Sequence, residues 1–127
     1  MDRLEQRLNV ARKAMAAFDE VMDLSNPTPI ERDAAIQRFE FTWEVTWKAA
    51  KQWLYDREGI DVGSPKGVVR SCREVGLLND DETEHALQMV DDRNLTVHTY
   101  DEKWAVEIFE RLKQHRPLLK KWLERLT

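Results

Sequence analysis

Apolar residues recur at alternating spacings of three and four along the first half of this chain, and this period limits its fold more than any other feature. Side chains three and four positions apart share one face of an α-helix, whereas a strand alternates every second residue. Strand alternation is absent, so the chain is predicted to be all-α. Two long apolar faces carry the period: Leu4, Leu8, Ala11, Met15, Phe18 and Met22, then Ile36, Phe39, Trp43, Trp47, Ala50 and Leu54.

Residues that start and stop helices divide the chain into about five of them. Asn26-Pro27 ends the first helix. Thr28-Pro29-Ile30-Glu31 begins the second with an N-cap, a proline at the first helical position and a capping box. This helix is expected to run to about Arg57, before the glycines at positions 59 and 63.

Three further helices are expected in the second half of the chain. Their starts are Ser64-Pro65, then Asn79 with Glu82 in a second capping box, then Asp101 as an N-cap. Gly76 should end the first of these three. Pro117 should kink or restart the last, because proline lacks the amide that an inner helical position donates.

Length and composition are those of one globular domain spanning residues 1–127. The chain is 35% charged and 42% hydrophobic, a soluble globular balance that argues against disorder. Two long and three shorter helices with short connections predict an antiparallel bundle. No apolar run approaches a membrane span, and the N-terminal residues lack the apolar core of a signal peptide. The lone Cys72, expected to be a small buried hydrophobe, suits a reducing cytoplasm.

Charge is unevenly distributed along the chain. The net charge of −4 argues against a protein that coats nucleic acid by bulk attraction. Residues 79–92 carry six carboxylates and no Lys or Arg, whereas residues 111–127 carry six cations and one carboxylate. Two interpretations remain open: two solvated helix faces, or an acidic strip that docks a partner and a basic segment that steers RNA.

A short motif joins an arginine, an amide and a histidine. On an α-helix Asn94 and His98 would share a face, and with Arg93 they would span an arc of roughly 140°. A histidine moves protons near neutral pH, and a guanidinium clamps phosphate oxygens with a planar fork. These groups predict a site that acts on a phosphodiester. The alternative is that Arg93 pairs with a carboxylate, His98 caps a helix end and Tyr100 packs its ring.

Other groups of residues are weaker candidates for a functional site. Glu82 and His85 have the Glu-x-x-His spacing of carboxylate-bridged metal bundles, but there is no second copy, so no metal site is predicted. The tryptophans at positions 43, 47 and 53 are expected in the core rather than stacked on bases. Glu40, Glu44 and Lys48 are expected to be ordinary surface pairs. His85 and His115 have no recognisable partners.

Several segments resemble the HEPN domains, small helical bundles that often act as metal-independent ribonucleases. Arg93-Asn94-x-x-x-His98 matches their arginine–polar–x3–histidine motif, and the extension to Tyr100 resembles HepT-type toxins, which accompany minimal nucleotidyltransferases. The resemblance to the branch called nucleotidyltransferase substrate-binding proteins covers nearly the whole chain. It rests on residues 38–44 with Trp47-Lys48, Ser64-Pro65, Val69-Arg70, Gly76-Leu77-Leu78 and residues 93–102.

This resemblance implies a homodimer in which two motifs face each other, paired with a separately encoded nucleotidyltransferase. Arg93, Asn94 and His98 would cleave RNA without a metal or other cofactor, and Tyr100 would accept adenylyl groups from the partner. An alternative within the same family is a non-catalytic subunit that presents a substrate to the nucleotidyltransferase. A structural helical adaptor unrelated to nucleotidyl transfer is the third alternative.

Overall fold

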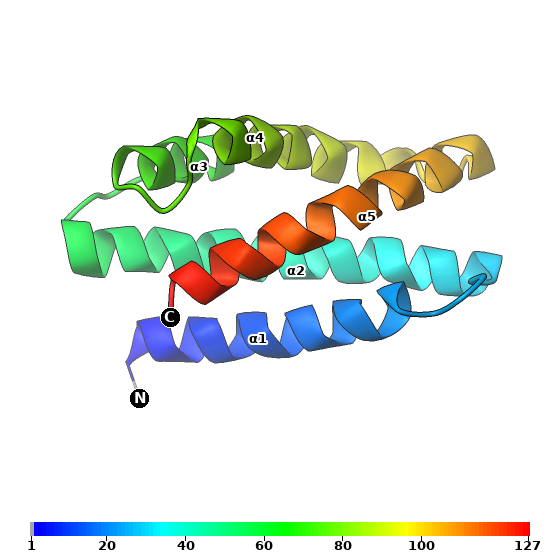
Figure 1. The fold of residues 1–127 in the computed structure, drawn as a ribbon, viewed down its shortest axis with the longest axis horizontal. Helices are drawn as coiled ribbons and strands as arrows, with labels where there is room; N and C mark the ends of the chain where they lie inside the picture. Colours follow the sequence, from blue (N-terminus) through cyan, green and yellow to red (C-terminus); the bar gives the residue numbers. More distant parts are fainter. Residues whose placement is uncertain (1) are drawn as a thin grey trace.

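The computed structural model describes residues 2–127 (Figure 1). These residues form five α-helices and no strand. They are α1 (Arg3–Met22), α2 (Pro29–Glu58), α3 (Pro65–Glu74), α4 (Asp80–Leu95) and α5 (Glu102–Arg125), with a 3-10 turn η1 (Thr96–His98) before α5. The all-α prediction and the number of helices are confirmed. None of the helices in residues 2–127 has the length and apolarity needed to cross a membrane.

The helices begin where their capping residues predict. The Thr28 hydroxyl accepts the Glu31 amide at 3.1 Å, and the Glu31 carboxylate accepts the Thr28 amide at 2.8 Å. Asn79 and Glu82 form the same reciprocal pair at 2.8 and 2.9 Å. Both capping boxes satisfy amides that the first helical turn leaves without partners. The chain reverses at Gly76, whose φ of 83° is costly for any residue with a Cβ atom.

Helix α2 lies between α1 and the pair α3 and α4, and α5 runs diagonally across α2 with its C-terminal end close to α1 (Figure 1). The five helices share one hydrophobic cluster. In its centre Trp43 and Trp122 pack with ring centroids 5.8 Å apart, and Phe18 contacts Phe39 at 6.2 Å. Trp43 is buried as predicted, while Trp47 and Trp53 are partly buried against the same cluster.

Helix α5 runs through Pro117 without interruption, so the predicted restart of this helix is wrong. Pro117 is exposed, whereas its neighbours Leu118 and Leu119 are buried. The apolar residues on both sides of the proline are therefore held against the core. Water can satisfy the carbonyl that the missing amide leaves free, because the proline lies on the solvent side of the helix.

Candidate functional site at the end of helix α4

The predicted site residues lie at one end of the bundle, where α4 turns into α5. Arg93 and Asn94 are on the last turn of α4, His98 closes η1, and Tyr100 lies two residues before the first turn of α5. The side chain of Arg93 is 27% exposed. Asn94 and His98 are exposed, and Tyr100 is 86% exposed. The segment therefore presents an imidazole and a phenol to solvent beside a half-buried guanidinium.

The α-helix ends at Leu95, so the expected shared helical face of Asn94 and His98 is wrong. Two threonines tighten the chain here: the Thr96 hydroxyl donates to the Arg93 carbonyl, and the Thr99 hydroxyl donates to the Thr96 carbonyl, both at 2.7 Å. The Thr99 amide donates to the same Thr96 carbonyl at 3.2 Å. Bonds across three residues produce a 3-10 turn, which rotates more per residue than an α-helix.

Arg93 faces two carboxylates of α2. Its Nη1 lies 3.9 Å from Glu40 Oε2, and its Nε lies 3.8 Å from Glu44 Oε1. Nη1 also donates to the Thr96 hydroxyl at 3.2 Å, while the buried Nε has no hydrogen-bond partner. Both ion pairs are long and neither is a bidentate fork, so the guanidinium retains donors for a planar anion.

The expectation that Glu40, Glu44 and Lys48 form ordinary surface pairs is therefore met only in part. Lys48 does lie 3.9 Å from Glu44, as the spacing of four residues predicts. Glu44 also accepts from the Trp47 indole at 3.3 Å, and both glutamates turn toward Arg93. The two carboxylates join α2 to the end of α4, a role that spacing along one helix does not reveal.

His98 contacts Tyr100 edge to face, with ring centroids 6.3 Å apart. Within residues 2–127, no hydrogen bond or ion pair connects His98 to Arg93. In a single copy of the chain, the two groups are near each other in sequence but are not assembled into one constellation. A phosphate bound by Arg93 would also approach the negative charges of Glu40 and Glu44.

A buried chain of hydrogen bonds lies directly behind this segment. His85 Nε2 is 2.9 Å from His115 Nδ1, and His115 Nε2 is 2.6 Å from Asp92 Oδ2. The other oxygen of Asp92 accepts from Arg111 Nη1 at 2.7 Å. Asp92 and His115 are each 2% exposed. The expectation that His85 and His115 lack partners is therefore wrong.

Sequence spacing carried a signal for this network. His85 and Asp92 are seven residues apart on α4, and Arg111 and His115 are four apart on α5, so each pair shares a helix face. What the spacing does not give is that these two faces pack against each other. The network anchors α4 to α5 at the residue immediately before Arg93.

The charge on Asp92 fixes how protons are arranged. A carboxylate only accepts, so His115 donates from Nε2 and its Nδ1 accepts from His85 Nε2–H. Burial lowers the pKa of His115, an effect that Asp92 opposes. Burial likewise lowers the pKa of His85, again opposed by Asp92. Both rings are therefore neutral at pH 7.

We expect the protein to lose stability as the pH falls below about 6.5, the value for histidine in an unfolded chain. The unfolded chain binds protons there while the folded one, with its lowered histidine pKa values, does not. The stabilisation is thus complete above pH 7 and disappears toward the folded pKa values. The midpoint of urea unfolding, measured between pH 5 and 8, tests this expectation. His85→Gln keeps a donor for His115 and should flatten the slope of this midpoint against pH.

The exposed His98 supplies the matched control for this experiment, because His98→Gln changes a histidine outside the network. It should leave the slope as in the parent. Glu82, whose pKa is lowered chiefly by its hydrogen bond with Arg125, titrates at more acidic pH and does not overlap. Equal slopes for the parent and His85→Gln would contradict the assignment of the acid loss to the pair.

Cys72 is fully buried, which confirms its predicted role as a small hydrophobe. Burial raises the pKa of its thiol to about 12, so the thiolate needed for nucleophilic chemistry is scarce at neutral pH. Glu82 is occupied by the Asn79 cap and by Arg125 at 2.8 Å. Neither residue adds to the site at the end of α4.

Comparisons with known proteins cover nearly all of this chain. Residues 6–127 match the family described as nucleotidyltransferase substrate binding protein like. A probable ribonuclease HepT from Haemophilus influenzae is 34% identical over 83 residues, which are 61% of this chain and 55% of that protein. The chain thus spans about half the length of this curated relative.

Two solved structures share the fold. A protein designated ttk003001694 from Thermus thermophilus is 54% identical with a TM-score of 0.88, over 91% of this chain and 98% of that one. HI0074 from Haemophilus influenzae, described as revealing the fold of a substrate binding domain of a nucleotidyltransferase, is 25% identical with a TM-score of 0.78. That match covers 94% of this chain and 98% of HI0074.

Proposed function

Because the chain belongs to the family of nucleotidyltransferase substrate-binding-like proteins, we propose that it is a metal-independent ribonuclease toxin neutralised by a separately encoded nucleotidyltransferase. One observation carries the proposal: the end of α4 and the segment that follows it hold a guanidinium without a bidentate carboxylate partner, an exposed imidazole and an exposed phenol, those of Arg93, His98 and Tyr100. Similarity to a probable ribonuclease supports the same assignment.

The proposed reaction uses the 2′-hydroxyl of RNA as an internal nucleophile. His98 accepts the proton of that hydroxyl as its oxygen attacks phosphorus. In a site formed by two copies of the chain, His98 of the second copy donates a proton to the departing 5′-oxygen. Arg93 stabilises the charge that develops on the phosphoryl oxygens, and Asn94 orients the imidazole. The bond to the 5′-oxygen breaks as the cyclic phosphate forms, so charge and protons balance without a metal.

The proposed active form is a homodimer. Arg93 and His98 are not connected within one chain, whereas two motifs facing each other would bring one copy's arginine toward the other copy's histidine. Val97, Tyr100 and Ile30 are exposed by 65%, 86% and 82%, and they lie at this end of the bundle. A second copy would cover apolar surface that is otherwise in contact with water.

A second candidate function is a non-catalytic subunit that binds a substrate for the nucleotidyltransferase. The specific observation in its favour is the position of Glu40 and Glu44, whose negative charges face Arg93 and oppose a phosphate there. The description of HI0074 as a substrate binding domain supports this candidate as well.

Cleavage of total RNA in the presence of a chelator separates the two candidates. The parent protein should cleave RNA and His98→Ala should not, with circular dichroism confirming that both fold. His98 is exposed, so its loss should not disturb the core. Equal cleavage by both proteins would indicate a contaminating nuclease, and no cleavage by either would favour the substrate-binding subunit.

Tyr100 is the proposed acceptor of adenylyl groups. Its phenol is exposed and lies beside His98, so an attached nucleotide monophosphate would add negative charge and bulk where RNA must bind. Co-expression with a neighbouring nucleotidyltransferase, ATP and magnesium should add about 329 Da per adenylyl group. Intact-mass spectrometry should show that Tyr100→Phe loses this addition, while Tyr55→Phe, also exposed, keeps it. Full modification of Tyr100→Phe would place the acceptor elsewhere.

A further inference from the structure

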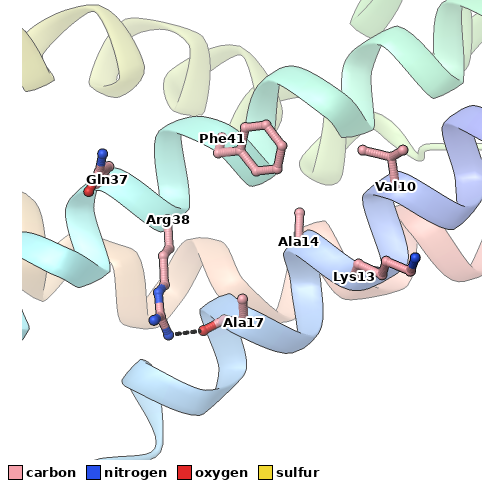
Figure 2. Close-up of a pocket in the computed structure, with 7 residues that line it drawn as sticks. All are labelled: Val10, Lys13, Ala14, Ala17, Gln37, Arg38 and Phe41. Carbon is pink, nitrogen blue, oxygen red and sulfur yellow. Dashed lines mark hydrogen bonds between the residues drawn. The ribbon is translucent and has the colours of Figure 1, made fainter.

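An apolar groove runs along the outer side of the α1–α2 pair, away from the buried core. It has a volume of about 520 Å³ and is lined by Val10, Lys13, Ala14, Ala17, Gln37, Arg38 and Phe41. Figure 2 shows Phe41 on α2 and Val10 on α1 above a floor formed by the two small alanines. Phe41 is 55% exposed and Val10 is 45% exposed.

The groove continues along the same two helices. Beyond Val10 it meets a smaller hollow of about 170 Å³, lined by Gln6, Arg7, Val10, Val45 and Lys48. From Arg7 to Ala17, α1 advances by about 15 Å, which is roughly three turns of a helix. We call the combined hollow the α1–α2 groove. Its length and apolar floor fit an amphipathic helix that presents one stripe of side chains.

The walls of the α1–α2 groove are fixed by hydrogen bonds between the helices. Arg38 Nη1 donates to the Ala17 carbonyl at 2.7 Å, a contact drawn in Figure 2. The buried Thr42 hydroxyl lies 3.2 Å from the Ala14 carbonyl. Arg7 Nη1 donates to the Lys48 carbonyl at 3.0 Å. The groove therefore exists before any partner binds, which reduces the entropy lost on binding.

Among residues 2–127, four cations and no carboxylate line the α1–α2 groove. The cations are Arg7, Lys13, Arg38 and Lys48. Glu20 lies 3.7 Å from Arg38 and Glu44 lies 3.9 Å from Lys48, whereas Lys13 has no ion pair within residues 2–127. The groove is thus locally basic on a chain with a net charge of −4. Such a border favours a ligand whose apolar stripe is flanked by negative charge.

The charges also decide between occupants. A second copy packed face to face here would bring two sets of these four cations together, which is unfavourable. RNA would satisfy the cations, but Val10, Ala14, Ala17 and Val45 offer aliphatic surface. Among the described residues that line the groove, Phe41 is the one aromatic ring on which a base could stack. An acid-flanked helix satisfies both the floor and the border.

We propose that the α1–α2 groove docks an amphipathic helix of a partner protein, with apolar side chains against Phe41 and Val10 and with Asp or Glu residues beside Lys13 and Arg38. This docking surface is separate from the turn that carries His98, and the proposal does not require ribonuclease activity.

The test uses a synthetic 18-residue helical peptide with leucines at helical spacing, glutamates on both flanks and a fluorescent label. A matched peptide has lysine in place of every glutamate. Fluorescence anisotropy should show that the glutamate peptide binds and that added salt weakens it. Phe41→Ala should reduce its affinity about 10-fold or more, and Lys13→Glu should narrow the preference for the glutamate peptide over the lysine peptide. Tyr55→Ala, an exposed residue of α2 outside this groove, should bind like the parent.

Amide chemical shifts then locate the binding site. Shifts concentrated at Val10, Ala14 and Phe41 support the proposal. It is overturned if neither peptide binds, if both bind equally, or if the shifts lie elsewhere. Self-association that Phe41→Ala abolishes would assign the groove to a second copy. A short single-stranded RNA that moves the same amides more strongly than the peptide would assign it to nucleic acid.

Discussion

Replacing Asp92 with alanine is expected to lower the free energy of unfolding by about 2–3 kcal/mol. Asp92 is 2% exposed and accepts from both His115 and Arg111. Its removal leaves the buried His115 N–H without an acceptor and opens a small cavity. Arg111 retains Glu107 at 2.7 Å, so its charge is not stranded and the loss stays below that of a fully broken ion pair.

Urea unfolding monitored by tryptophan fluorescence measures this loss, and the neighbouring Asp91 provides the control. Asp91 is 61% exposed and pairs with Lys66 at 3.0 Å, so Asp91→Ala should change stability by about 0.5 kcal/mol or less. Adding Asp92→Ala to His115→Phe should cost much less than it does alone, because the unsatisfied donor is then absent. An unchanged midpoint for Asp92→Ala would show that the network contributes nothing to stability.

Arg93→Lys is expected to reduce RNA cleavage by roughly 10²–10³-fold although it preserves the charge. An ammonium cannot reproduce the planar fork, and it would be drawn into compact pairs with Glu40 or Glu44, which lie 3.9 and 3.8 Å from the guanidinium. Single-turnover cleavage of a labelled RNA measures the loss. Arg70→Lys, an exposed position on α3, should cleave at the parent rate. Parent rates from Arg93→Lys would remove Arg93 from the proposed mechanism.

The helical frame could be predicted because its signals are local. A capping box requires residues three positions apart, and Thr28 with Glu31 and Asn79 with Glu82 form both boxes as the sequence indicates. The helical period placed Trp43 in the core for the same reason. The family could be predicted because several separate segments, spread over most of the chain, matched it together.

The remainder depends on packing between helices. His85 and His115 are 30 residues apart, and no pattern in the sequence predicts that the helix faces carrying them pack together. Arg93 meets Glu40 and Glu44 only because α2 passes beside α4. Local competition also matters: the hydroxyls of Thr96 and Thr99 end α4 before His98, against the expectation that Asn94 and His98 share one helical face.

The docking of α5 against α1 also determines when folding can finish. The carboxylate of Asp19 on α1 accepts hydrogen bonds from Arg116 Nε at 2.7 Å and from Lys120 Nζ at 2.8 Å. These contacts join residues about a hundred positions apart in the sequence. Helix α5 further supplies Leu119 and Trp122 to the core. During synthesis, α1 and α2 can pair early as neighbours, but their apolar faces stay partly open until residues up to about Arg125 have left the ribosome. Until then Trp43 and Phe39 lack Trp122 and His115, the two rings of α5 against which they pack in the folded protein.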